Sequence, residues 1–265
     1  MSKTTENSLH GMGKKLLGNA RGFLLVAALA FAVPAAGAAE TETLFAPFAA
    51  LLESSVQDGQ VTYADFAQST AYASMINRLG KERLPASASS DERLATYINA
   101  YNALSIQGIL DGFSPSSIFS RLKFFKRRQY EVFGTSMTLY ELEHENIISA
   151  GDPRIHFAIV CSSKSCPPLI NTLYSADTLD AQLNAVTADF INNSQSNRFD
   201  LKRKQADLSR IFKWYGDEFE AEAGSLAQFL ARYVTDDALK ASLQTDDWDF
   251  DYLDYDWSLN GTSPE

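Results

Sequence analysis

The sequence predicts an α+β fold, a single compact domain with a central, mainly antiparallel sheet flanked by helices. Three observations carry this prediction: amphipathic segments that open with helix-capping residues, a hairpin-like stretch at residues 130–139, and an apolar run of strand length at residues 155–161. With 45% hydrophobic residues in a chain of 265, the composition favours a folded core over disorder.

Residues 1–38 have the features of a secretory signal peptide. Basic residues precede an apolar stretch at residues 23–33, and the small residues 36–38 supply the pattern of a cleavage site. The apolar stretch is too short for a comfortable membrane span. We therefore expect residues 39–265 to form one globular domain that is periplasmic or secreted and has no stable membrane span.

The charge of the chain argues against nucleic acid as a partner. The formal net charge is −10, and loss of residues 1–38, which carry a net +3, would bring it to −13. Proteins that bind nucleic acid instead present basic surfaces to the phosphate backbone.

The first half of the chain is predicted to be mainly helical, because its apolar residues recur at helical spacing. Helices are predicted at residues 42–53, 64–80 and 89–112, and a short strand at residues 61–63. The third helix has the clearest boundaries, since Ser89 and Glu92 form a capping box at its start and Gly112 supplies its end.

The third helix contains two asparagines on one face, Asn99 and Asn102. Asparagine is a poor helix former, so two of them in an otherwise apolar helix need specific hydrogen-bond partners. Either they tie down the backbone of a neighbouring loop, or one amide lines a site and stabilises an oxyanion.

A basic cluster follows this helix, in a chain that is otherwise acidic. It consists of Arg121, Lys123, Lys126, Arg127 and Arg128. Such a cluster is usually a solvated face. If it borders the cysteine-containing loop, it would favour a carboxylate-bearing substrate.

The stretch from residue 138 to residue 168 comes next and holds nearly all the reactive side chains of the expected mature chain. Thr138 and Glu141 form a second capping box, which predicts another helix. The apolar run 155–161 is predicted to be a strand buried on both faces, with the loop 162–168 at its carboxyl end.

Two helices and a strand are predicted in the last third of the chain. The helices cover residues 175–192 and the segment that begins at Ser225. The tail at residues 246–260 alternates acids with aromatics, as an edge strand does, and a change of parity at residues 252–253 predicts a bulge. The tail contains several aspartates but lacks the loop glycine and the final glutamate of an EF-hand. A plain strand is therefore favoured over a calcium site.

Two histidines and two cysteines lie within 23 positions of one another: His144, His156, Cys161 and Cys166. The third histidine, His10, belongs to the predicted signal peptide. Four interpretations stay open: a structural disulfide, a nucleophilic thiol activated by a histidine, a zinc site, and a buried inert thiol. The spacing H-x11-H-x4-C-x4-C matches no standard zinc finger, so we expect no metal and no other cofactor.

Spacing also limits which side chains could react together. On a regular strand His156 and Cys161 face opposite sides, so Cys161 would need His144, whereas Cys166 in the loop could reach either histidine. Glu143 points about 100° away from its neighbour on a helix, so we expect it to serve His156 or a loop amide.

Five ordered motifs give a family resemblance: YINAYNALSIQGIL, LYELEHENI, RIHFAIVCSSKSCPPL, LSRIFKWYGDEF and DYLDYDWSLN. Together they resemble the family catalogued as domain of unknown function 547, over residues 44–260. The resemblance implies a compact α+β domain with a cysteine-peptidase-like site. The family's glutamate, histidines and cysteines fall on Glu143, His144, His156, Cys161 and Cys166.

The sequence therefore favours a thiol-dependent acyl-transfer enzyme, a hydrolase or peptidase-like protein that acts on a small peptide or amide. Cys166 or Cys161 would attack the carbonyl, His144 or His156 would act as base and then acid, and Glu143 would orient a histidine. One of the paired asparagines would stabilise the oxyanion. The alternative is a non-catalytic periplasmic binding or interaction domain with a Cys161–Cys166 disulfide.

Overall fold

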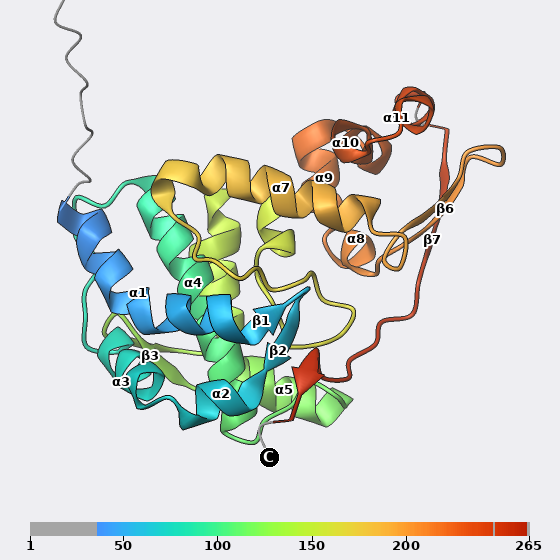
Figure 1. Ribbon diagram of the computed structural model, residues 1–265. Coiled ribbons are helices and arrows are strands. Elements are labelled where there is room, and N and C mark those ends of the chain that lie inside the picture. The colour runs from blue at the N-terminus through green and yellow to red at the C-terminus, as the bar shows by residue number, and fades with distance from the viewer. Residues whose placement is uncertain (1–35, 246, 264–265) are drawn as a thin grey trace, which may run out of the picture. The chain divides into compact units, whose positions relative to one another are not determined.

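Helix α4, Ser90–Leu110, runs through the centre of the computed structural model, which describes residues 36–245 and 247–263 (Figure 1). Side chains are buried around its whole circumference, as expected for a helix that is enclosed on all sides. Its predicted capping box is confirmed: the Ser89 hydroxyl accepts from the Glu92 amide, and the Glu92 carboxylate accepts from the Ser89 amide. The predicted signal peptide, residues 1–38, lies almost wholly outside the described residues.

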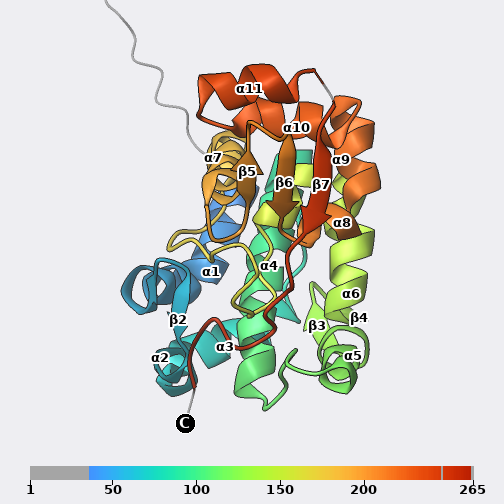
Figure 2. The same ribbon diagram turned by 90° about the vertical axis from the view of Figure 1, so that its right-hand side faces the viewer.

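The other elements surround α4, and the views in Figures 1 and 2 agree on this arrangement. The helices are α1 Ala36–Ser55, α2 Tyr63–Gln68, α3 Thr70–Leu79, α5 Ile118–Lys126, α6 Leu139–Glu141, α7 Leu179–Asn192, α8 Ile211–Trp214, α9 Gly216–Ala223, α10 Leu226–Tyr233 and α11 Asp237–Leu243. The strands are β1 Val56–Gln57, β2 Gln60–Thr62, β3 Tyr130–Val132, β4 Thr135–Met137, β5 Arg198–Asp200, β6 Gln205–Leu208, β7 Asp249–Tyr252 and β8 Gly261–Thr262. No helix within these residues combines the length and the apolar content that crossing a bilayer requires.

The α+β class is confirmed, with the strands of the described chain divided among three small sheets. Strand β1 pairs antiparallel with β2, which pairs in parallel with β8 from the far end of the chain. Strands β3 and β4 form the predicted hairpin. Strand β5 pairs antiparallel with β6, and β7 is the edge strand in parallel with β6.

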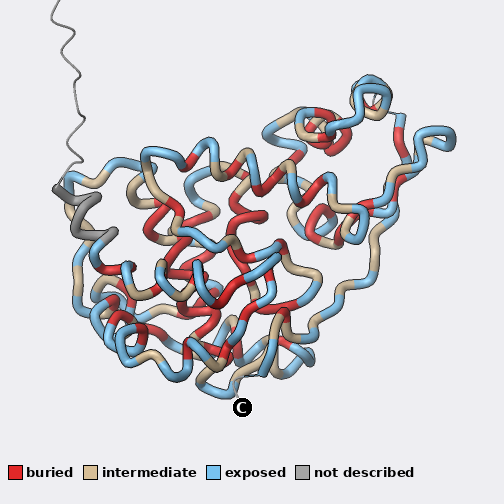
Figure 3. The backbone as a smooth tube through the Cα atoms, viewed as in Figure 1, coloured by how far each residue is buried: buried red, intermediate tan, exposed pale blue. Residues whose placement is uncertain are grey.

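The core lies between these sheets and the helices, and Figure 3 shows its buried residues in the middle of the molecule. Around Phe157 four other phenylalanine rings pack within 5.2 to 6.4 Å, centroid to centroid. They are Phe190, Phe212, Phe219 and Phe229. Aromatic contacts of this kind join α7, α8, α9 and α10 to the segment that carries His156.

The prediction of a strand at residues 155–161 is wrong. Asp152 caps a 3-10 helix, Pro153–Phe157, through a hydrogen bond from the Arg154 amide, and the following residues belong to no strand. Pro153 suits the first turn of a helix, because it has no amide proton to leave unpaired. The apolar run reflects enclosure by helices, and a short apolar run cannot by itself distinguish the two cases.

Asn99 and Asn102 take over the pairing that a neighbouring strand would have supplied. The Asn102 amide donates to Ala158 O at 3.0 Å and accepts from Val160 N at 2.8 Å. Asn99 makes the same pair of bonds with the backbone of Tyr174, at 2.8 and 2.9 Å. The interpretation that these amides tie down a neighbouring backbone is therefore confirmed.

The predicted helix after Thr138 is present but not regular. Its capping box with Glu141 is formed, and α6 then widens into a π-helical turn, Leu142–Ile147, before a 3-10 turn ends it. Gly151 follows with φ of +77°, a conformation that glycine adopts without strain.

The prediction of a bulge in the tail is wrong. Strand β7 ends at Tyr252, where the parity of the aromatic residues changes, so the change marks the end of the strand. Beyond it, residues 253–260 run along the loop that holds the cysteines, and Ser163 and Leu259 form an isolated bridge between the two segments.

We predict that Asn102→Ala lowers the free energy of unfolding by about 2 to 5 kcal/mol, because two buried backbone groups each lose a hydrogen-bond partner. Chemical denaturation would measure this change. Asn77→Ala is the matched control, since its amide also bonds to a backbone carbonyl but is exposed on α3. Similar changes for the two variants would contradict the role given to Asn102.

Candidate active site

A cavity of about 520 Å³ is lined by all five side chains that the sequence marked as catalytic candidates. They are Glu143, His144, His156, Cys161 and Cys166. They come from the π-helical turn, the 3-10 helix and the cysteine loop, and helices α5 and α8 and the tail complete the walls. The fold thus brings the chemistry-bearing residues of one stretch of sequence into one hollow.

The two cysteines face each other as free thiols. Their sulfur atoms lie 3.0 Å apart, and the backbone amide of Cys161 donates to Cys166 Sγ, also at 3.0 Å. The loop between them can turn back because Ser162 has a φ of +59° and its hydroxyl is hydrogen-bonded to Ser105 of α4.

Cys161 is the thiol best prepared to ionise. The Cys166 sulfur lies 3.0 Å from its sulfur, and the hydroxyls of Ser163 and Tyr255 lie at 3.1 and 3.3 Å. These hydrogen bonds, that from Cys166 above all, lower the pKa of Cys161 to about 7. Burial and the adjacent Cys161 sulfur raise the pKa of Cys166. As the pH rises through about 7, Cys161 therefore loses its proton first, while Cys166 keeps its own.

Tyr255 reaches this site from the C-terminal tail. The tail is held against the cysteine loop by backbone bonds from Lys164 N to Ser258 O and from Ser165 N to Asp256 O. Burial raises the pKa of the Tyr255 phenol, which therefore keeps its proton and can donate it in a hydrogen bond. Tyr255 was missed as a site residue, although it lies in one of the motifs that carry the family resemblance.

His156 is paired with a carboxylate that sequence reasoning also missed. Its Nε2 lies 2.9 Å from Glu218 Oε2, and its ring stacks on Tyr215 at 3.6 Å. The side chain is 1% exposed, and Nδ1 has no hydrogen-bond partner among the described residues. One imidazole nitrogen is thus oriented by an acid while the other stays available.

Glu143 does not serve His156 or a loop amide, contrary to expectation. Its carboxylate accepts from Tyr215 Oη at 2.8 Å and from Tyr101 Oη at 3.3 Å. Because Tyr215 also stacks on His156, Glu143 acts on the histidine only through that ring. The orienting acid is Glu218, whose position 62 residues from His156 gave no local signal.

His144 lines the cavity from the π-helical turn. Its Nδ1 is bonded to Tyr140 O at 3.0 Å, and the two rings stack at 3.8 Å. Within the part of the chain that the structure describes, no hydrogen bond joins either histidine to a sulfur atom. The expected direct pairs, Cys166 with His156 or Cys161 with His144, are therefore not formed in this structure.

Two residues of the basic cluster border the cavity. Arg121 lies over the Trp257 ring at 4.4 Å, and Lys126 lies over the Tyr140 ring at 3.9 Å. Trp257 also contacts Tyr255 and Trp214, at 4.4 and 5.7 Å between ring centroids. The walls of the cavity are thus aromatic, with cationic groups held against the rings.

The paired asparagines do not line this cavity. Asn99 and Asn102 are 4% and 3% exposed, and both amides are engaged with backbone groups. Their proposed oxyanion role has no geometric support. Among the described residues, no group of three His, Cys, Asp or Glu side chains could hold a metal ion.

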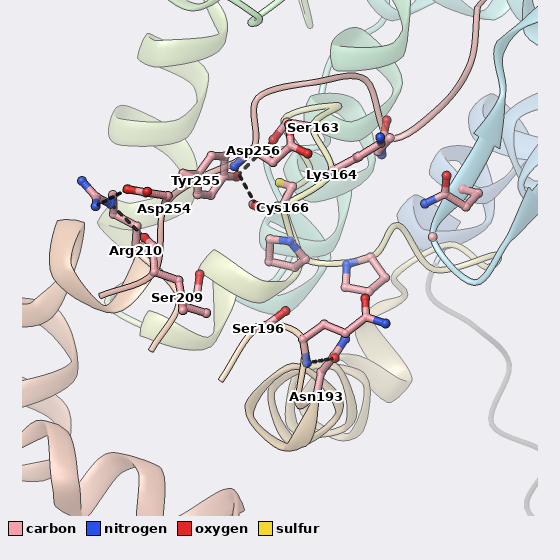
Figure 4. A pocket seen from close by; sticks show the side chains of 18 of the residues that line it. Ser163, Lys164, Cys166, Asn193, Ser196, Ser209, Arg210, Asp254, Tyr255 and Asp256 are labelled. Atoms are coloured by element: carbon pink, nitrogen blue, oxygen red, sulfur yellow. Dashed lines mark hydrogen bonds and ion pairs between the residues drawn. The ribbon is translucent and has the colours of Figure 1, made fainter. Parts of the chain in front are cut away.

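A second cavity, of about 340 Å³, shares Cys166, Pro167 and Tyr255 with the first (Figure 4). Its other lining is largely polar and includes Lys164 and Arg210. The loop that carries the thiols therefore contributes to two cavities of different character.

Comparison with known proteins supports the family resemblance. Residues 85–191 match the model of a family described as "Protein of unknown function, DUF547". The match contains α4, both histidines and both cysteines of the cavity. Neither a curated protein nor a solved structure matches the chain.

We predict that, in the reduced protein, alkylation by iodoacetamide has a fast phase whose rate rises with pH through about 7, the pKa of Cys161. The phase should vanish in Cys161→Ser. In Cys166→Ala the midpoint of the rate's pH dependence should move to higher pH, because the main hydrogen bond to the Cys161 thiolate is gone.

Tyr255→Phe should move the midpoint in the same direction by a smaller amount, and Tyr233→Phe, at a distant tyrosine, should not move it. A fast phase that survives in Cys161→Ser and vanishes in Cys166→Ala would reverse the assignment.

Proposed function

We propose that the protein is a thiol-dependent acyl-transfer enzyme, a hydrolase acting on a small peptide or amide, with Cys161 as the nucleophile. One observation carries the proposal: a thiol with a pKa lowered to about 7 shares a cavity with a buried histidine that a carboxylate orients. A thiol, an imidazole and an acid are the three groups that cysteine-dependent acyl transfer requires.

In the proposed reaction the Cys161 thiolate attacks the carbonyl carbon of the substrate. The C–N bond then breaks, and the amine leaves with a proton donated by the His156 imidazolium, so that a thioester remains on the enzyme. Water attacks the thioester while the imidazole accepts a proton. The carboxylic acid product leaves, and the Cys161 thiolate and the His156 imidazolium that began the cycle are restored.

Glu218 takes the role that the sequence gave to Glu143. It holds Nε2 of His156, which leaves Nδ1 as the atom that exchanges the proton. Catalytic hydrogen bonds are often long in a substrate-free site and shorten when substrate binds. The absence of a direct bond between His156 and the Cys161 sulfur in this structure is compatible with that behaviour.

The cavity favours a substrate with an apolar body and a carboxylate. Its aromatic walls suit apolar groups, and Arg121 and Lys126 place positive charge beside them. A cationic rim raises the local concentration of anionic ligands. The proposed substrate is therefore an acyl compound or a small peptide that carries a free acid.

A second candidate is a non-catalytic binding or interaction domain with a Cys161–Cys166 disulfide. The sulfur separation of 3.0 Å favours it, because a bond at about 2.05 Å would need only a small approach. Oxidation would consume the proposed nucleophile, so the thiol content of the isolated protein separates the two candidates.

We also propose that the protein is exported to the periplasm or secreted after loss of residues 1–38. The basic, apolar and small-residue segments at the N-terminus support this. A cut after residue 38 would keep the buried residues Leu44 and Phe45 of α1 in the mature domain. The domain would thus retain the described core contacts of this helix.

For export, we predict that the mature protein recovered from its native cell begins at or near Ala39, as N-terminal sequencing would show. Recovery of intact chain only, anchored in the membrane, would reject the proposal.

For catalysis, we predict hydrolysis of 4-nitrophenyl hexanoate by the reduced protein and its loss in Cys161→Ser. His156→Ala should lower kcat by about a hundredfold or more, as expected for a general acid and base. Glu218→Gln should lower kcat by less, because the imidazole stays in place but is poorly oriented. His144→Ala should have the smallest effect of the three.

The mono-4-nitrophenyl ester of adipic acid tests the substrate class with the same leaving group. It should have the higher kcat/KM, and Arg121→Ala or Lys126→Ala should remove that preference, whereas Lys123→Ala, outside the cavity lining, should keep it. Equal hydrolysis by wild type and Cys161→Ser would overturn the proposed enzyme.

A further inference from the structure

Helix α5 exposes three large apolar side chains. Ile118, Phe119 and Leu122 are 74%, 81% and 40% exposed. Single exposed apolar residues are common on protein surfaces, but three within five positions form a patch that calls for a partner. Helix α5 lies at the opposite end of the described domain from α10 and α11 in both views (Figures 1 and 2).

The opposite side of α5 holds the helix on the domain, so the patch cannot turn inward. Phe124 is fully buried and packs edge to face against Phe125, with ring centroids 4.8 Å apart. Ser117 caps the helix through a hydrogen bond from the Ser120 amide. The exposed face is therefore a fixed feature of the fold.

Basic side chains continue the exposed face of α5. Lys123 follows Phe119 by four positions and Lys126 follows Leu122 by four, so each lies one turn beyond an apolar residue. Neither Lys123 nor Arg127 forms an ion pair with any residue in the described ranges 36–245 and 247–263. The chain as a whole has a net charge of −10, so this local excess of positive charge is against the general trend.

The aromatic wall of the main cavity, the one lined by both cysteines, also lies beside α5. Arg121, Phe125 and Lys126 of α5 line that cavity together with Trp214, which is 45% exposed, and Trp257. Tryptophan beside basic residues is the composition that proteins present to the headgroup region of a bilayer.

We propose that α5 is a peripheral membrane-binding helix, which inserts Ile118, Phe119 and Leu122 into the surface of an anionic bilayer. Apolar side chains supply burial at the acyl boundary, and the adjacent lysines and arginine supply attraction to anionic headgroups. Stable attachment needs two such signals, and α5 carries both. The acidic remainder of the chain is repelled by the same surface, so α5 is the face that makes contact.

The proposed attachment sets the orientation of the main cavity. Because three residues of α5 also line it, the cavity opens beside the region that would touch the lipid headgroups. This inference does not depend on the proposed chemistry, since it is tested by binding alone.

Vesicle flotation tests the proposal with the reduced full chain and variants that share its N-terminus. Wild type should bind vesicles that contain phosphatidylglycerol more strongly than vesicles of phosphatidylcholine alone, and added salt should weaken this binding. The double variants Phe119→Ser with Leu122→Ser, and Lys123→Glu with Arg127→Glu, should each weaken it by about tenfold or more.

Leu201→Ser with Lys202→Glu is the matched control, because it changes an exposed leucine and a neighbouring lysine on the turn between β5 and β6. Its binding should equal that of wild type. All of these proteins share residues 1–38, where basic residues precede an apolar stretch, so the difference between the α5 variants and this control assigns the binding to α5.

Binding without preference for phosphatidylglycerol, or equal binding by both α5 variants and wild type, would overturn the proposal. A wild-type dimer that Phe119→Ser with Leu122→Ser converts to monomer, without lipid preference, would assign the face to a second copy of the chain and would also overturn it.

Discussion

The candidate site depends on hydrogen bonds that leave the middle of a buried helix. Helix α4 is enclosed on all sides, so the backbone of the segments that pack on it must find partners away from water. Asn102 supplies partners to Ala158 and Val160, and Ser105 bonds to Ser162. These bonds flank Cys161, whose sulfur is consequently held where its partners can reach it.

A second constraint comes from the end of the chain. The tail runs beside the cysteine loop and places Tyr255 at the thiol, while Tyr63 of α2 donates to Asn260 at 2.6 Å and holds the tail from the other side. The groups that lower the pKa of Cys161 are thus assembled from the loop itself and from a segment 94 residues away. The reactivity of this thiol is a property of the complete tertiary fold.

Local signals in the sequence were dependable where the structure is local. The capping boxes at Ser89 and Thr138 each involve residues three positions apart, and both are formed. The cavity residues were also found, because histidine and cysteine are rare in this chain and occur close together. Glu218 and Tyr255 were missed as site residues, since their pairing with His156 and Cys161 spans 62 and 94 positions and leaves no local pattern. The apolar run before Cys161 was misread because enclosure by helices and burial in a sheet demand the same composition.

The π-helical turn at Leu142–Ile147 changes which of the following residues face inward. In an α-helix the consecutive residues Glu143 and His144 would point about 100° apart. Here both line one cavity, and the wider turn places Ile147 instead of Asn146 at the next buried position. Loss of one residue here would return the segment to α-helical phase and exchange the side chains that face inward. At this point in the chain, a change of length is therefore more disruptive than most changes of residue type.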